Sequence, residues 1–125
     1  MKHSLLTLGI IAAIGWASPS GMAAEPRVPL KVVYLGNEGT PRAAEFVDFL
    51  RTRFEQVGER KRDDLDLESV GAFDVVLLDW SQSDTPLEKA VSPLGPRADW
   101  SKPTVLFGIA GLLLATSWDT IGGAG

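Results

Sequence analysis

The apolar positions of this chain fall into three short runs, separated by polar and glycine-rich segments. Residues 30–35 (LKVVYL), 73–80 (FDVVLLDW) and 104–107 (TVLF) are nearly continuous in apolar residues and rich in β-branched and aromatic side chains. Runs of this length and composition are typical of strands covered on both faces, as in the centre of a parallel sheet. We therefore predict three core strands.

A longer pattern with helical spacing follows the first of these strands. Its apolar positions are Ala43, Phe46, Val47, Leu50, Phe54 and Val57. Thr40 is a suitable cap, Pro41 suits the first helical position, and Gly58 is a natural stop. The pattern predicts an amphipathic helix that begins after Thr40 and ends before Gly58.

The remaining segments are polar or punctuated by glycine and proline. Residues 59–64 (ERKRDD) mix both charges, which favours a solvated edge segment or short edge strand over a phosphate or partner patch. Residues 65–72 predict a loop or a single helical turn, and residues 81–101 a long loop with one short helix around 87–91. Residues 108–115 (GIAGLLLA) predict a tight bend and a helix start. This alternation predicts an α/β fold with a doubly wound parallel sheet and right-handed crossovers.

The first 24 residues have the composition of a secretory signal. A basic start precedes the apolar residues 5–16 (LLTLGIIAAIGW), and the small residues 17–24 (ASPSGMAA) end before Glu25. A membrane anchor is the alternative, but a span needs about twenty apolar residues. We expect cleavage after residue 24, a secreted or periplasmic location, and a single α/β domain over residues 25–125.

Composition removes several kinds of chemistry. The net charge is −4, which argues against nucleic-acid binding because that requires a basic face. The chain has no cysteine, and its one histidine is His3, so a thiol nucleophile and a serine–histidine triad are excluded from the exported part. Residues 104–118 are too short and too interrupted by glycine to span a membrane. Nothing in the motifs calls for a cofactor or a metal.

Ligands of open α/β sheets bind at the carboxyl ends of the strands. The first segment predicted there consists of Gly36, Asn37, Glu38, Gly39 and Thr40. Its glycines and the helix start that follows suit an anion. However, Glu38 adds a negative charge, and the spacing matches neither a dinucleotide fingerprint nor a P-loop, so an ordinary strand-to-helix turn is the alternative.

Two further segments end strands at the same edge. Asp79, Trp80 and Ser81 offer a carboxylate, an indole and a hydroxyl, which together suit a sugar or a flat ring. The alternative is an aspartate that ends the strand, with Trp80 covering the sheet edge. Asp79 with Glu38 is the one carboxylate pair that suits acid–base work. Gly108 opens the bend after the third strand and completes the candidate ligand-binding set.

This bend also carries a family resemblance. Residues 103–115 (PTVLFGIAGLLLA) resemble the strand and nucleophile elbow of class I glutamine amidotransferases, whose catalytic cysteine falls on Ala110. Residues 30–54 and 72–80 are similar to the trehalose-utilisation-protein-like (ThuA-like) branch of that superfamily. The resemblance implies a flavodoxin-like sheet and a link to carbohydrates. It also implies further strands, so we expect a fragment of a larger domain, incomplete at the C-terminus.

These observations favour a secreted domain without catalytic activity that binds a small polar or carbohydrate ligand. Two alternatives remain open. In a flavodoxin-like cofactor-binding protein, residues 36–40 would hold a phosphate and Trp80 would stack on the ring. In a structural or interaction module, an uncovered sheet edge would pair with another chain or with a second copy of this one.

Overall fold

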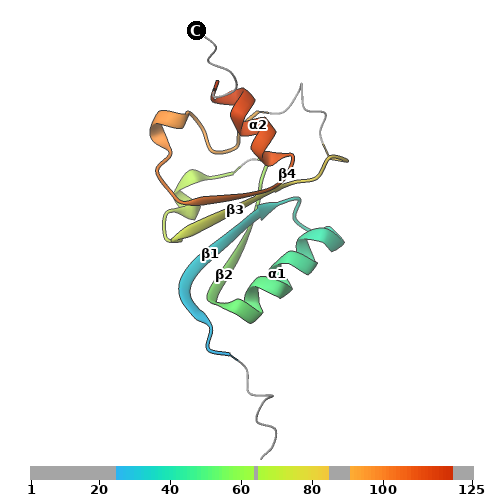
Figure 1. Cartoon of the computed structure of the whole chain (residues 1–125), viewed down its shortest axis with the longest axis vertical. Coiled ribbons are helices and arrows are strands. Elements are labelled where there is room, and N and C mark those ends of the chain that lie inside the picture. The colour runs from blue at the N-terminus through green and yellow to red at the C-terminus, as the bar shows by residue number, and fades with distance from the viewer. Residues whose placement is uncertain (1–24, 64, 85–90, 120–125) are drawn as a thin grey trace, which may run out of the picture.

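A four-stranded parallel sheet lies between two helices in the computed structural model, which describes residues 25–63, 65–84 and 91–119 (Figure 1). The strands are β1 (Val28–Gly36), β2 (Phe54–Lys61), β3 (Val75–Trp80) and β4 (Thr104–Gly108). Their order is β2-β1-β3-β4, and each neighbouring pair is parallel. This is the flavodoxin-like α/β arrangement, so the predicted fold class is confirmed.

The two helices cover opposite faces of the sheet (Figure 1). Helix α1 (Pro41–Arg53) packs on the face that carries Val32 and Tyr34, whereas helix α2 (Ala110–Ser117) packs on the face that carries Val33 and Leu35. Successive side chains of a strand point to opposite faces, and here both faces are buried. That double burial explains the continuous apolar runs of β1 and β3.

The end of helix α1 differs from the prediction. The helix stops at Arg53, and β2 begins at the next residue, Phe54, so Gly58 lies within a strand and is not a helix stop. Phe54 pairs with Val28 of β1, and this pairing draws residues 54–61 into the sheet. Phe54 and Val57 still pack against the core beneath α1, which is why their spacing suggested a longer helix.

The polar segments agree with the predictions in part. Strand β2 is an edge strand, as expected for the charged run, but Arg62 is only 2% exposed, so the solvated interpretation is wrong there. The predicted single turn is the 3₁₀ helix η2 (Leu67–Val70). A second 3₁₀ helix, η4 (Arg97–Asp99), lies in the long loop. The expected helix around 87–91 falls mostly on residues 85–90, outside the described residues, as does the predicted signal segment 1–24.

The bend between β4 and α2 is built on Gly108. Its φ is +66°, and a Cβ atom there would overlap the carbonyl oxygen of Trp80, so only glycine fits. The N–H of Ile109 donates to that same oxygen at 2.9 Å. Ala110 is the first residue of α2 and is fully buried. The left-handed residue of the bend is therefore Gly108, and Ala110 lies in the core.

Candidate functional site

A cavity of about 160 Å³ lies where β1 and β3 end, beside the start of helix α1. It is lined by Tyr34, Asn37, Thr40, Pro41, Arg42, Asp79, Ser81, Ser83 and Asp84. We call this the Asp79 cavity. Its position follows from the topology, because the carboxyl ends of parallel strands and the helix start that follows β1 meet at one edge of the sheet.

A buried ion pair forms the centre of the Asp79 cavity. Asp79 is 3% exposed, and the Nε and Nη2 atoms of Arg42 donate to its two carboxylate oxygens at 2.7 and 2.8 Å. The hydroxyl of Tyr34 donates to Oδ2 of Asp79 at 2.5 Å. A carboxylate held by the two-pronged guanidinium fork and a third donor is compensated for its loss of water. The Arg42 side chain itself is 46% exposed, so it forms part of the cavity wall.

The ionisation of these three groups follows from their contacts. Burial acts to raise the pKa of Asp79, but the hydrogen bonds from Arg42 and Tyr34 and the nearby guanidinium charges hold that pKa below its ordinary value. Burial, with the hydrogen bond to Asp79, raises the pKa of Tyr34 far above its ordinary value. The hydrogen bond to Asp79 also raises the pKa of Arg42. At neutral pH the site thus holds a fixed carboxylate, a neutral phenol and a fixed cation, none of which is suited to proton transfer.

Local sequence places these side chains. Thr40 caps helix α1 by accepting from the N–H of Ala43 at 3.3 Å, and its own hydroxyl donates to the carbonyl of Asn37 at 2.7 Å. The cap fixes the first helical turn, from which Arg42 reaches Asp79. Gly36 leaves room for the Tyr34 ring, since a Cβ atom at Gly36 would lie 2.6 Å from the phenolic oxygen.

A second arginine lies behind the cavity. The Nη1 atom of Arg62 donates to the carbonyl oxygen of Asp79 and to a carboxylate oxygen of Asp84, both at 3.1 Å. The Cζ atom of Arg62 lies 3.8 Å from the centre of the Trp80 ring. Arg62 thus joins the end of β2 to the end of β3 and to the turn that follows it.

The structure brings some of the predicted residues together and separates others. Asn37, Thr40, Asp79 and Ser81 meet in the Asp79 cavity. The remaining five candidates do not line it: Gly36, Glu38, Gly39, Trp80 and Gly108. The Asp79 carboxylate, which was expected to work with Glu38 as an acid–base pair, is hydrogen-bonded to Arg42 and Tyr34.

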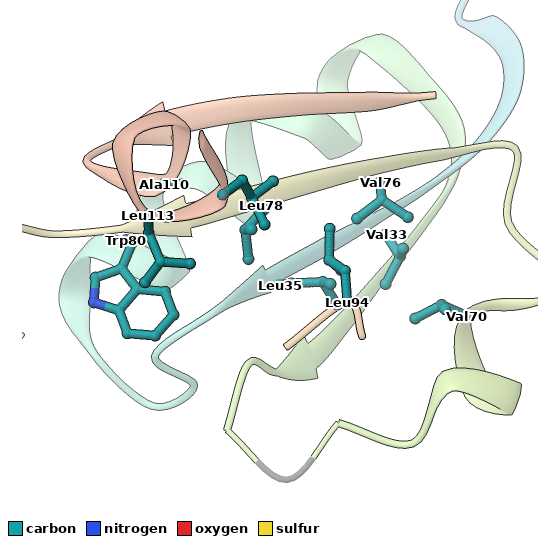
Figure 2. Close-up of a cluster of buried hydrophobic side chains, with 10 residues drawn as sticks. Val33, Leu35, Val70, Val76, Leu78, Trp80, Leu94, Ala110 and Leu113 are labelled. Carbon is teal, nitrogen blue, oxygen red and sulfur yellow. The ribbon is translucent and has the colours of Figure 1, made fainter. Parts of the chain in front are cut away.

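Trp80 is placed differently from the ligand-binding prediction. Its side chain is in the core beside Ala110 and Leu113 and is only 3% exposed (Figure 2). One face of its ring is covered by Arg62. The indole is therefore not available to stack on a ligand.

Tyr34, Arg42 and Arg62 are among the residues of the site that the sequence did not predict. A cation in the first turn of a helix, such as Arg42, is disfavoured by the helix dipole unless it has a partner. Its position in the sequence therefore indicates that Arg42 has an acidic partner. Tyr34 is a polar tip on an otherwise apolar strand, and a buried tyrosine hydroxyl needs a partner. Arg62 belongs to a run of mixed charges, in which no single residue stands out.

Comparison with known proteins adds no family assignment: no protein-family model, no curated protein and no solved structure matches this chain. The chain is thus defined by its fold, a parallel α/β sheet with strand order β2-β1-β3-β4. Within the described ranges, no cluster of three or more histidine, aspartate or glutamate side chains is arranged to hold a metal ion. Over the same residues, no helix is long and apolar enough to cross a membrane.

Proposed function

We propose that this protein is an exported ThuA-like, glutamine-amidotransferase-like domain that binds a small, uncharged polar ligand in the Asp79 cavity and does not act on it chemically. The observation that carries the proposal is the internal pairing of the cavity's charges. Asp79 is paired with Arg42, and Asp84 is paired with Arg62. A ligand with a net charge would have to compete with these pairs, whereas a neutral one needs only hydrogen bonds.

The other groups of the cavity suit hydroxyl-bearing ligands. Asn37, Thr40, Ser81 and Ser83 contribute amide and hydroxyl groups that both donate and accept. The volume of about 160 Å³ is below the range of roughly 300–1,000 Å³ for drug-sized ligands, which favours one small molecule. A carbohydrate or related polyol has both properties, in agreement with the family resemblance of the sequence.

The proposed lack of catalysis rests on the residues that an amidotransferase would need. The position of its cysteine is Ala110, which is buried, and residues 25–125 contain neither cysteine nor histidine. The carboxylate of Asp79 is held in an ion pair with Arg42. We propose a secreted or periplasmic location from the composition of residues 1–24.

A phosphate-bearing cofactor is the weaker hypothesis. Two carboxylates, Asp79 and Asp84, face the cavity in which a phosphate would have to lie. The indole expected to stack on its ring, Trp80, is buried.

Calorimetric titration of the full chain with glucose, trehalose and inorganic phosphate tests this proposal. We expect at least one of the two saccharides to bind and phosphate not to bind. The Ser81→Ala variant should lower saccharide affinity about fivefold through the loss of a neutral hydrogen bond, and Ser101→Ala, an exposed serine outside the cavity, should leave it unchanged. Binding of phosphate in place of both saccharides would refute the proposal, as would a folded protein that takes up none of the three.

A further inference from the structure

We infer that Arg62 is a positioning residue for the Asp79 cavity: from beneath the cavity it holds the end of β3 and the following Ser81–Asp84 turn in the shape that receives the ligand. The inference deepens the proposed function and rests on it. Arg62 does not line the cavity itself. It acts through Asp84 and through the backbone of Asp79, both of which do.

The contacts of Arg62 converge on one short segment. Its Nη1 atom donates to the Asp79 carbonyl and to Oδ2 of Asp84, and its guanidinium lies against the Trp80 ring. Its Nε atom lies 3.5 Å from a carboxylate oxygen of Asp63. Arg62 thus touches three of the six residues from 79 to 84 while being nearly completely buried.

Asp84 connects Arg62 to Ser81 in the wall of the cavity. The same Oδ2 atom that accepts from Arg62 also accepts from the N–H of Ser81 at 3.3 Å. The N–H of Asp84 donates to the carbonyl of Ser81 at 3.0 Å and closes the turn. Without Arg62, the Asp84 carboxylate would lose its direct ion-pair partner in a partly buried place, and the turn would lose its anchor.

The geometry requires an arginine and not just a positive charge. A planar guanidinium can stack on an indole while its edge donates to two acceptors, whereas the rounded ammonium of lysine cannot do both in the same way. A lysine at position 62 should therefore supply the charge but not the shape of the contact.

The charge of Arg62 also acts on Asp79. Burial acts to raise the pKa of that carboxyl, and the Arg42 and Tyr34 hydrogen bonds, with the charges of Arg42 and Arg62, lower it. The charged and titratable groups that face this cluster are Arg42 from α1, Tyr34 from β1, Arg62 and Asp63 after β2, and Asp84 from the turn. Glu59 of β2 faces Tyr34 as well.

The test compares Arg62→Met, Arg62→Lys and the control Arg60→Met, which removes the same charge two residues earlier, from the end of the edge strand β2. Arg60 donates to its neighbour's carbonyl and lies over Phe73, away from the cavity. Glucose affinity is measured by calorimetry, the Asp79 pKa by carbon NMR of its carboxyl, and the opening of the turn by hydrogen exchange at the Ser81 amide.

We expect Arg62→Met to lower glucose affinity about tenfold, as loss of a charged hydrogen bond would, and to raise the pKa of Asp79. It should also speed exchange at Ser81 while leaving the Ala43 amide of the α1 cap unchanged. Arg62→Lys should keep the Asp79 pKa near that of the wild type and recover only part of the affinity. Arg60→Met should change none of these quantities.

Each outcome bears on the inference separately from the proposed function. If the wild type binds no glucose, faster Ser81 exchange and a raised Asp79 pKa in Arg62→Met still support the positioning role, and their absence overturns it. If Arg62→Met does not fold, Arg62→Lys decides: wild-type affinity and wild-type Ser81 exchange together would overturn the role. A folded Arg62→Met with unchanged affinity, pKa and exchange overturns it directly.

Discussion

Asp79 keeps its charge inside the protein because three donors surround it. Its pKa is lower in the folded protein than the ordinary 3.8, so the folded state binds this proton less tightly than the unfolded chain does. The contribution of Asp79 to stability is therefore complete above about pH 5 and is lost as the pH falls through 3.8 towards the folded-state pKa.

Replacing Asp79 by Asn should remove this contribution. At pH 7 we expect the free energy of unfolding to fall by about 2 kcal/mol, since a charged hydrogen-bond acceptor is lost. The variant should also lose part of the acid sensitivity between pH 5 and pH 2. Urea unfolding at several pH values measures both effects. An Asp79→Asn protein with the wild-type dependence on pH would contradict this assignment of the acid-sensitive group.

Tyr34 makes an opposite prediction at high pH. Its pKa is raised in the fold, so above about pH 10 the unfolded chain releases this proton while the folded protein keeps it. Stability should therefore decline as the pH rises beyond 10, and Tyr34→Phe should reduce that decline. Ultraviolet titration of the chain's single tyrosine reports the ionisation directly. An ordinary tyrosine titration near pH 10 in the folded state would be inconsistent with the buried contact.

Substitutions at two glycines with positive φ, Gly108 and Gly39, distinguish the cost of backbone strain from the cost of steric crowding. Gly108→Ala should cost about 3 kcal/mol or more, because the added methyl group would overlap the Trp80 carbonyl in addition to the left-handed penalty. Gly39→Ala has the penalty alone, about 1 kcal/mol, since nothing lies within 4 Å of its Cβ position. Chemical denaturation of the two variants gives the comparison, and equal losses would count against the close packing of the bend.

At the scale of the elements, the start of helix α1 was predictable from the sequence and its end was not. Thr40 and Pro41 have local preferences that act within one turn, so the cap could be identified without the fold. Phe54 has the spacing of a helical residue, and only its pairing with Val28 across the sheet makes it a strand residue. Pairing between distant segments is invisible to a local pattern.

The cap itself can be tested by substitution. Thr40→Ala should lower the free energy of unfolding by about 1 kcal/mol, because the N–H of Ala43 loses its acceptor. Thr52→Ala in the last turn of the same helix is the matched control and should be close to neutral. The same loss in both variants would show that the cap contributes nothing of its own. Because the cap also fixes Arg42, Thr40→Ala should weaken saccharide binding as well.

The site was predictable only in part, and the reason is again pairing at a distance. Asp79 and Ser81 are predictable because they lie at the end of a buried strand, and Asn37 and Thr40 because they lie before a helix. The partners of Asp79 come from segments 37 and 45 residues away in the chain. Which charges pair and which side chains are buried at such separations depends on the tertiary structure. The burial of Trp80, whose indole could equally lie at a surface, depends on it in the same way.

Across the whole molecule, the two sheet edges differ in their protection. The β2 edge carries Glu55, Glu59, Arg60 and Lys61. These charges hinder pairing with another strand. The β4 edge contains no charged residue, and Val105 and Leu106 are 45% and 40% exposed. Self-association through β4 remains a prediction, and the difference between the edges favours this side.

Leu106→Lys should suppress such self-association. A charge on the exposed edge strand would have to be desolvated when a second copy pairs with it. Leu112→Lys is the control, because Leu112 is exposed on helix α2 and not on the edge strand. Sedimentation velocity over a range of concentrations gives the comparison. A monomer at every concentration in the wild type would disprove the prediction, and equal suppression by both variants would place the contact elsewhere.

Helix α1 passes directly from Arg53 to Phe54 of β2 with no loop between them. This limits which insertions and deletions the segment can accept. Adding or deleting one residue within α1 would turn the following segment by about 100° around the helix axis and would also exchange inward and outward side chains along the strand. No linker is present to absorb either change. The length of the chain from Thr40 to Lys61 is therefore held constant by geometry, and substitutions are tolerated there more readily than insertions or deletions.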